Sequence, residues 1–106
     1  MIAVIFEVRP LAEQKDKYFD IAAELRPELL KADGFISVER FQSLTDEDKY
    51  LSLSFWQDRQ SVDNWYRNAN HHQAQETGRR SVFKDYRIRV ADVFRDYDME
   101  AGRPIG

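Results

Sequence analysis

The chain opens with residues that are almost continuously apolar as far as Phe6, several of them β-branched. A short apolar run of this kind is typical of a strand that is at least partly covered on both faces. We therefore predict a strand over residues 2–9, which Arg9-Pro10 ends.

The next segment, residues 11–32, carries apolar side chains at helical spacing, namely Tyr18, Ala22, Leu25 and Leu29. This spacing predicts a helix, and Asp33-Gly34 ends it because glycine tolerates the left-handed conformation found at helix ends. Pro27 lacks a backbone donor and clashes with the preceding turn. We therefore expect a kink there, or a second helical piece that starts near Arg26.

Two further strand patterns, residues 35–42 and 49–56, flank the polar turn 44–48 and predict an antiparallel hairpin. Alternation divides the second strand into one face with Leu51, Leu53 and Phe55 and another with Tyr50, Ser52, Ser54 and Trp56. Serines between two aromatic residues leave room for a cavity, but a face packed on another sheet would show the same pattern. The sequence leaves both interpretations open.

Asp58 is placed to cap a helix whose side chains include Val62, Trp65, Tyr66 and Ala69. Asn70 is placed to cap a following helical run over residues 71–80. Ile88 and Val90 then alternate with arginines in a final strand over about residues 86–95.

The predicted order is strand, helix, strand, strand, helical pair, strand, which is the split βαβ pattern of the α+β ferredoxin-like fold. We expect a four-stranded antiparallel sheet with helices on one face, in a domain over residues 1–97 followed by a polar tail, residues 98–106. In so small a domain, a second copy is the simplest cover for the other face, which would give a homodimeric α+β barrel.

The composition excludes several classes of partner. The chain has 106 residues, enough for one domain, and a formal net charge of -3, without the basic excess of a general nucleic-acid binder. It has no cysteine, so neither disulfides nor thiolate metal sites are available. The first residues do not read as a signal peptide and no apolar run is long enough to span a membrane, so we expect a cytoplasmic protein.

His71 and its neighbour His72 are the only side chains with an ordinary pKa close to neutral, which makes His71 a candidate general acid or base. On a helix they point about 100° apart, so only one is expected to face inward. The alternative is a capping or surface histidine. Adjacent helical histidines do not converge on a metal, and no phosphate loop, nucleophile elbow or dinucleotide motif is present. We therefore predict neither metal nor cofactor.

Trp65 shares a helix face with Ser61, one turn earlier. A tryptophan at this spacing is either core or the wall of a ligand pocket. An apolar pocket edged by a hydroxyl and an indole donor would suit a flat aromatic ligand.

Several short motifs stand in the second half of the chain, namely Trp56, Ser61-Val62, Trp65, His71, Gln75, Gly78-Arg79-Arg80, Asp85-Tyr86-Arg87 and Arg95-Asp96-Tyr97, with Gly34 to Glu39 earlier. With these motifs, residues 1 to about 97 resemble the antibiotic biosynthesis monooxygenase family of small dimeric α+β proteins, most strongly after Trp56. This resemblance implies oxidation of phenolic polycyclic substrates by O2 without flavin, haem or metal, in a cavity between sheet and helices. A related branch degrades haem, but Glu7, Val8 and Gln75 stand where that branch has its asparagine and histidine, which argues against haem chemistry here.

We therefore expect a cofactor-independent monooxygenase for a small aromatic or quinol-type molecule. By resemblance, the catalytic residues are His71 and Trp65, and the substrate-binding residues are Ser61, Trp56, Tyr66, His72 and Phe6. The alternative is a non-catalytic small-molecule binding or stress-response module that uses the same cavity.

Overall fold

The computed structural model describes residues 1–75 and 82–100; within it, the side chains of residues 69–75 are left undescribed. The elements, in chain order, are β1 (Ile2–Pro10), a short 3-10 turn (Ala12–Gln14), α1 (Lys15–Lys31), β2 (Phe35–Gln42), β3 (Tyr50–Trp56), α2 (Arg59–Gln75) and β4 (Phe83–Asp92).

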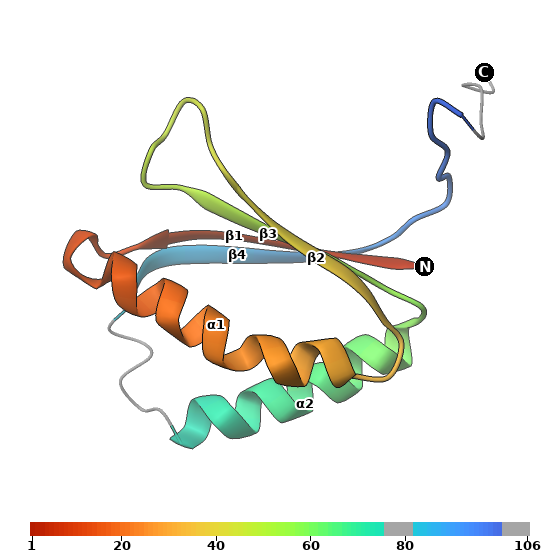
Figure 1. The fold of residues 1–106 in the computed structure, drawn as a ribbon, viewed down its shortest axis with the longest axis horizontal. Helices are drawn as coiled ribbons and strands as arrows, with labels where there is room; N and C mark the ends of the chain where they lie inside the picture. The colour runs from red at the N-terminus through yellow and green to blue at the C-terminus, as the bar shows by residue number, and fades with distance from the viewer. Residues whose placement is uncertain (76–81, 101–106) are drawn as a thin grey trace.

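The strands form one antiparallel four-stranded sheet in the order β2-β3-β1-β4. Both helices cover the same face of this sheet, and the chain after β4 leads away from the domain (Figure 1). This arrangement confirms the predicted α+β ferredoxin-like fold. β1, one of the two central strands, contributes most to the core, with Ile2, Val4 and Val8.

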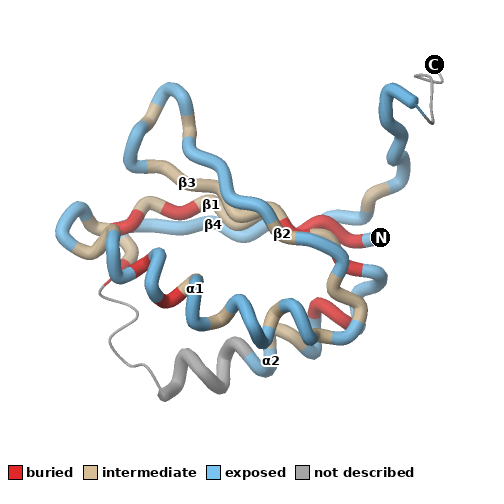
Figure 2. Tube along the Cα trace, viewed as in Figure 1, coloured by how far each residue is buried: buried red, intermediate tan, exposed pale blue. Residues whose placement is uncertain are grey.

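The core lies between the sheet and the helices and divides into two clusters of buried residues. One contains Ile2, Val4, Trp56 and Val62, and the other contains Val8, Tyr18, Ile21 and Val82. The buried positions accordingly follow β1 and the inner faces of the helices (Figure 2). Burial of these side chains is the main favourable term that fixes the helices on this face.

The helix stop and the hairpin are confirmed. Gly34 has a positive φ of 80°, and β2 and β3 have the predicted bounds to within one residue. The face of β3 with Tyr50, Ser52, Ser54 and Trp56 is covered by the helices, as Trp56 and Ser54 are buried. Packing of that face on another sheet, one of the two interpretations, is therefore wrong.

The final strand begins and ends about three residues earlier than predicted, over Phe83–Asp92 in place of residues 86–95. Its pairing with β1 sets these limits, since Phe83 pairs with Pro10 and Asp92 pairs with Ile2. Just beyond the paired residues of β1 and β4, the Val93 N–H donates a hydrogen bond to the carbonyl oxygen of Met1. Strand length here is decided by the partner strand.

The predicted break before the second part of α2 is absent, and Asn70 lies within one continuous helix rather than at a cap. The cost of an asparagine inside a helix is only a fraction of a kcal/mol, roughly 0.5–0.7, which neighbouring residues readily offset. Residues 76–80 of the predicted run lie outside the described residues.

Pro27 does not begin a second helical piece, since α1 runs from Lys15 to Lys31 with the proline inside it. Pro27 and Ala23, four residues before it, are both exposed. The carbonyl that loses its helical partner therefore faces water, which can replace the missing hydrogen bond.

Candidate functional site

The helices leave part of the sheet uncovered along β4. Tyr86, Ile88 and Val90 pair with Val8, Phe6 and Val4, and directly opposed residues of antiparallel strands project to the same face. They therefore lie on the helix side of the sheet. They are nevertheless 60%, 42% and 50% exposed. We call these three residues the β4 strip, an apolar surface beside the core.

A group of aromatic rings closes one end of the β4 strip. The ring of Phe6 lies 6.1 Å from that of Phe83 and 5.8 Å from that of Tyr86, and the Phe83 and Tyr86 rings are 5.9 Å apart. Such edge and tilted contacts fix the ring orientations. Sequence reasoning named Phe6 but missed the strip, although the alternation of Ile88 and Val90 with arginines was its signal.

Tyr66 reaches the core from α2. Its ring packs against the cluster that contains Ile2 and Val4 of β1. Its hydroxyl oxygen is buried and has no hydrogen-bond partner within the described part of the chain. Burial raises the pKa of this phenol, so it is a neutral group that can donate one hydrogen bond.

The two tryptophans stack into the same cluster with their ring centres 6.1 Å apart. Trp56 is 1% exposed, and its indole N–H donates a hydrogen bond of 3.0 Å to the Ser54 hydroxyl. Trp65 is partly buried against the cluster. Trp56 is therefore a core residue whose only donor is occupied, whereas Trp65 lies between core and surface.

Ser61 lies in the first turn of α2 and is buried. Its hydroxyl donates to the Asp58 carboxylate at 2.7 Å. Gly34 lies so close to it that an added Cβ would collide with the Ser61 side chain. This packing places Ser61 at the junction of α2 with the turn before β2.

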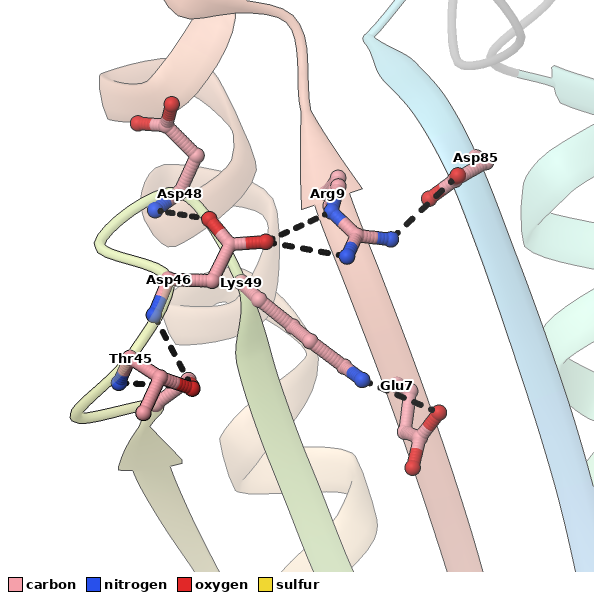
Figure 3. Close-up of polar contacts among 8 residues, drawn as sticks. Glu7, Arg9, Thr45, Asp46, Asp48, Lys49 and Asp85 are labelled. Atoms are coloured by element: carbon pink, nitrogen blue, oxygen red, sulfur yellow. Dashed lines mark hydrogen bonds and ion pairs between the residues drawn. The ribbon is translucent and has the colours of Figure 1, made fainter.

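The open face of the sheet carries an ordered set of charges at one end (Figure 3). The Arg9 guanidinium contacts Asp46 of the β2–β3 loop at 2.9 Å, and this hydrogen bond lowers the pKa of Asp46. The Glu7 carboxylate forms ion pairs with the Lys49 ammonium at 3.6 Å and with the Arg89 guanidinium at 3.5 Å. These pairs attach the hairpin and β4 to the central strand β1.

The sequence profile of the antibiotic biosynthesis monooxygenase family matches residues 1–77. The chain belongs to this family. The family resemblance read from the sequence is thereby confirmed.

Two curated relatives support this family assignment. The protein named "Jasmonate monooxygenase ABM" of Pyricularia oryzae is 52% identical over 93 residues, which are 88% of this chain and 43% of that protein. The uncharacterized protein YqjZ of Bacillus subtilis is 30% identical over 95 residues, which are 88% of this chain and 79% of YqjZ. The chain thus spans less than half the length of the first relative.

The fold of this family member also matches solved structures. A crystal structure from Deinococcus radiodurans that bears the same family name has a TM-score of 0.78 at 12% identity, over 93% of this chain and 98% of that one. At such identity the match shows the shared fold. No helix among the described residues is long and apolar enough to cross a membrane.

The expected site residues of this family member lie in different parts of the structure. Trp56, Trp65 and Tyr66 meet at one core cluster, and Phe6 lies at the neighbouring cluster. Ser61 lies at the start of α2, beside the first cluster. His71 and His72 lie on α2, but their side chains fall outside the described residues. Their catalytic and binding roles stay predictions.

Proposed function

We propose that this chain is a monooxygenase that acts on a small, mainly apolar carbonyl compound of the jasmonate type. The observation that carries this proposal is the 52% identity, over 88% of the chain, to a relative named for jasmonate oxidation. The substrate would lie on the helix side of the sheet, between α2 and the β4 strip.

The chemistry of the described surface supports this class of substrate. Jasmonate has a ring ketone, a hydrocarbon chain and one carboxylate. The β4 strip and the rings of Phe6 and Phe83 offer an apolar surface for the ring and the chain. Such sites combine apolar walls with a few polar groups that orient the ligand.

A second candidate is the phenolic or quinol-type aromatic substrate expected from the family resemblance. The cluster of Phe6, Phe83 and Tyr86 favours it, because aromatic rings pack well against a flat aromatic ligand. In this reaction Trp65 would form part of the pocket wall. His71 would remove or donate the proton that generates the electron-rich phenolate.

The two candidates differ in their need for a reductant. Hydroxylation of an ordinary C–H bond by O2 yields one alcohol and one water, and it consumes two electrons and two protons from a donor. Oxidation of a phenol-activated methylene to a carbonyl yields one water, and the substrate supplies all the electrons. Cofactor independence is therefore proposed for the phenolic candidate, whereas hydroxylation of jasmonate would require an external reductant.

The test is oxygen consumption combined with mass spectrometry of the products. Jasmonic acid and anthrone would each be supplied with and without NADPH and a flavin. Product formation from jasmonic acid only with a reductant supports the first candidate, and oxidation of anthrone without one supports the second. Binding of either compound without any oxidised product would instead favour a non-catalytic binding module.

The variants His71→Ala and Trp65→Phe would be compared with Leu30→Ala as a control, because Leu30 is exposed on α1. Loss of turnover by about 100-fold in His71→Ala is the size expected for removal of a general acid or base. Turnover of both variants at the control rate would remove these two residues from the mechanism.

We also propose that two copies of the chain pair through the open face of the sheet. That face carries Ile5, Leu51, Leu53 and Phe55, by the register of β1 and β3. Its two edge strands carry opposite charges, and Glu39 of β2 lies in the same cross-strand row as Arg89 of β4. A two-fold axis parallel to the strands would bring each Glu39 next to the partner's Arg89.

A further inference from the structure

The phenol of Tyr66 makes no hydrogen bond within the described part of the chain. Its hydroxyl oxygen is buried and unpartnered among the residues that the structure describes. A buried hydroxyl without a hydrogen bond costs about 1–3 kcal/mol. Such a group is expected to acquire a partner that the described residues do not supply, and water or a ligand can provide it.

The surroundings of Tyr66 restrict what that partner can be. The buried residues of the cluster against which it packs are Ile2, Val4, Trp56 and Val62, with partly buried Trp65 beside them. They are apolar apart from the indole N–H groups, and that of Trp56 already donates to Ser54. A carboxylate brought into this cluster would be an unpaired buried charge, which is strongly unfavourable. An uncharged acceptor such as a ketone oxygen meets no such penalty.

The position of Tyr66 also suits a ligand on the β4 strip. Its ring contacts the cluster that includes Val4, and Val4 is paired with Val90 of the strip. Val90 is half exposed on the same face of the sheet. A ring lying on the strip would therefore lie beside the cluster that Tyr66 contacts.

We propose that the Tyr66 hydroxyl donates a hydrogen bond to the uncharged carbonyl oxygen of the substrate and so selects ketones over the corresponding hydrocarbons. This inference rests on the proposed function, because it takes its ligand from that substrate class. It makes Tyr66 the residue that orients the ring, while the substrate carboxylate stays outside the apolar cluster.

The test compares two ligands that differ only at the ring carbonyl. One is dihydrojasmonic acid, and the other is the same acid with the ring ketone replaced by methylene. Binding of each to the wild-type chain, to Tyr66→Phe and to Tyr97→Phe would be measured by isothermal titration calorimetry, which needs no turnover. Tyr97→Phe is the matched control, because Tyr97 lies beyond β4 and is exposed.

The wild type and the control should bind the ketone about tenfold more tightly than the methylene compound, the effect of one neutral hydrogen bond. Tyr66→Phe should lose that preference and bind the methylene compound as well as the wild type does. Without ligand, Tyr66→Phe should unfold at the same temperature as the wild type or at a higher one, because the substitution removes a hydroxyl that has no partner among the described residues.

Three results would overturn the inference. An undiminished ketone preference in Tyr66→Phe would show that another group recognises the carbonyl. A fall of several degrees in its unfolding temperature would show that the hydroxyl already has a structural partner. Failure of the wild type to bind either acid would remove both the inference and the jasmonate-type substrate, whereas ketone-selective binding without turnover would contradict the oxygenase activity alone.

Discussion

The carboxylate of Asp58 accepts two hydrogen bonds from Ser61, one from its backbone N–H at 2.8 Å and one from its hydroxyl at 2.7 Å. The first satisfies a backbone donor in the opening turn of α2, which is the function of a helix N-cap. The second commits the only proton of the Ser61 hydroxyl. Toward a ligand, Ser61 can therefore act only as an acceptor unless this contact opens.

The Asp58 cap should make stability depend on pH. The backbone N–H and the hydroxyl of Ser61 lower the pKa of Asp58 from its ordinary value of 3.8. A lowered folded-state pKa stabilises the fold above the ordinary value, and this contribution is lost as the pH falls through the folded-state pKa. In Asp58→Asn, which can still cap α2, the difference between thermal unfolding at pH 6 and at about pH 3 should be smaller than in the wild type.

Asp58→Ala, the matched comparison, removes the cap at every pH. We expect its unfolding temperature to fall by about 5 °C at neutral pH. Equal unfolding temperatures for Asp58→Ala and the wild type would contradict the capping role.

Gly34→Ala should destabilise the chain through two effects. The positive φ of 80° disfavours any side chain, and the new Cβ would collide with the Ser61 side chain. Together these should lower the free energy of unfolding by about 2 kcal/mol or more, measured by urea denaturation. Asp33→Ala, at the exposed neighbouring position, is the control. A similar small decrease in the free energy of unfolding of both variants would refute the close approach of Gly34 to Ser61.

Ser54→Ala should destabilise the core although it removes only one oxygen. Ser54 accepts the indole N–H of Trp56, and both residues are buried. The substitution leaves that donor unpaired, at a cost of about 1–3 kcal/mol in the free energy of unfolding. Ser52→Ala, on the same face of β3 but outside the Trp56–Ser54 hydrogen bond, serves as the control. If the two variants unfold at the same urea concentration, the Trp56 hydrogen bond contributes little.

Leu53→Glu should prevent the proposed pairing of two copies. Leu53 projects from the open face, opposite Ile5 of β1. A charge buried between two sheets without a partner would cost several kcal/mol. Sedimentation should show dimers for the wild type and for Leu30→Glu, which changes an exposed residue of α1, but monomers for Leu53→Glu. Sedimentation of the wild type as a monomer would contradict the proposed pairing of two copies.

Much of the fold could be predicted because its signals are local. The alternation along residues 49–56 gave β3, and Asp33-Gly34 gave the end of α1. The limits of β4 could not be predicted, because Pro10 and Ile2 of β1 set them from the far end of the chain. The continuity of α2 through Asn70 was missed for a different reason, since capping residues also occur inside helices at small cost.

The candidate site was predictable in part. Helical spacing placed Trp65 on the apolar face of its helix, whereas Phe6 and Tyr66 were named through the family resemblance. It could not distinguish Trp56 as core from Trp56 as pocket wall, which depends on the helices above it. Nor could it show that the Ser61 hydroxyl is already bonded to Asp58.

By itself, then, the sequence determined the class of fold, the order of its elements and the family, since periodicity and turn residues act over a few positions. Only the tertiary structure decided which apolar residues are covered. Ile88 and Val90 have the same alternating pattern as buried strand residues, yet they remain half exposed because the helices lie over the other strands. Likewise, the Tyr66 hydroxyl has no partner among the residues that the structure describes, which depends on every group that packs around it and is not recorded in any local pattern.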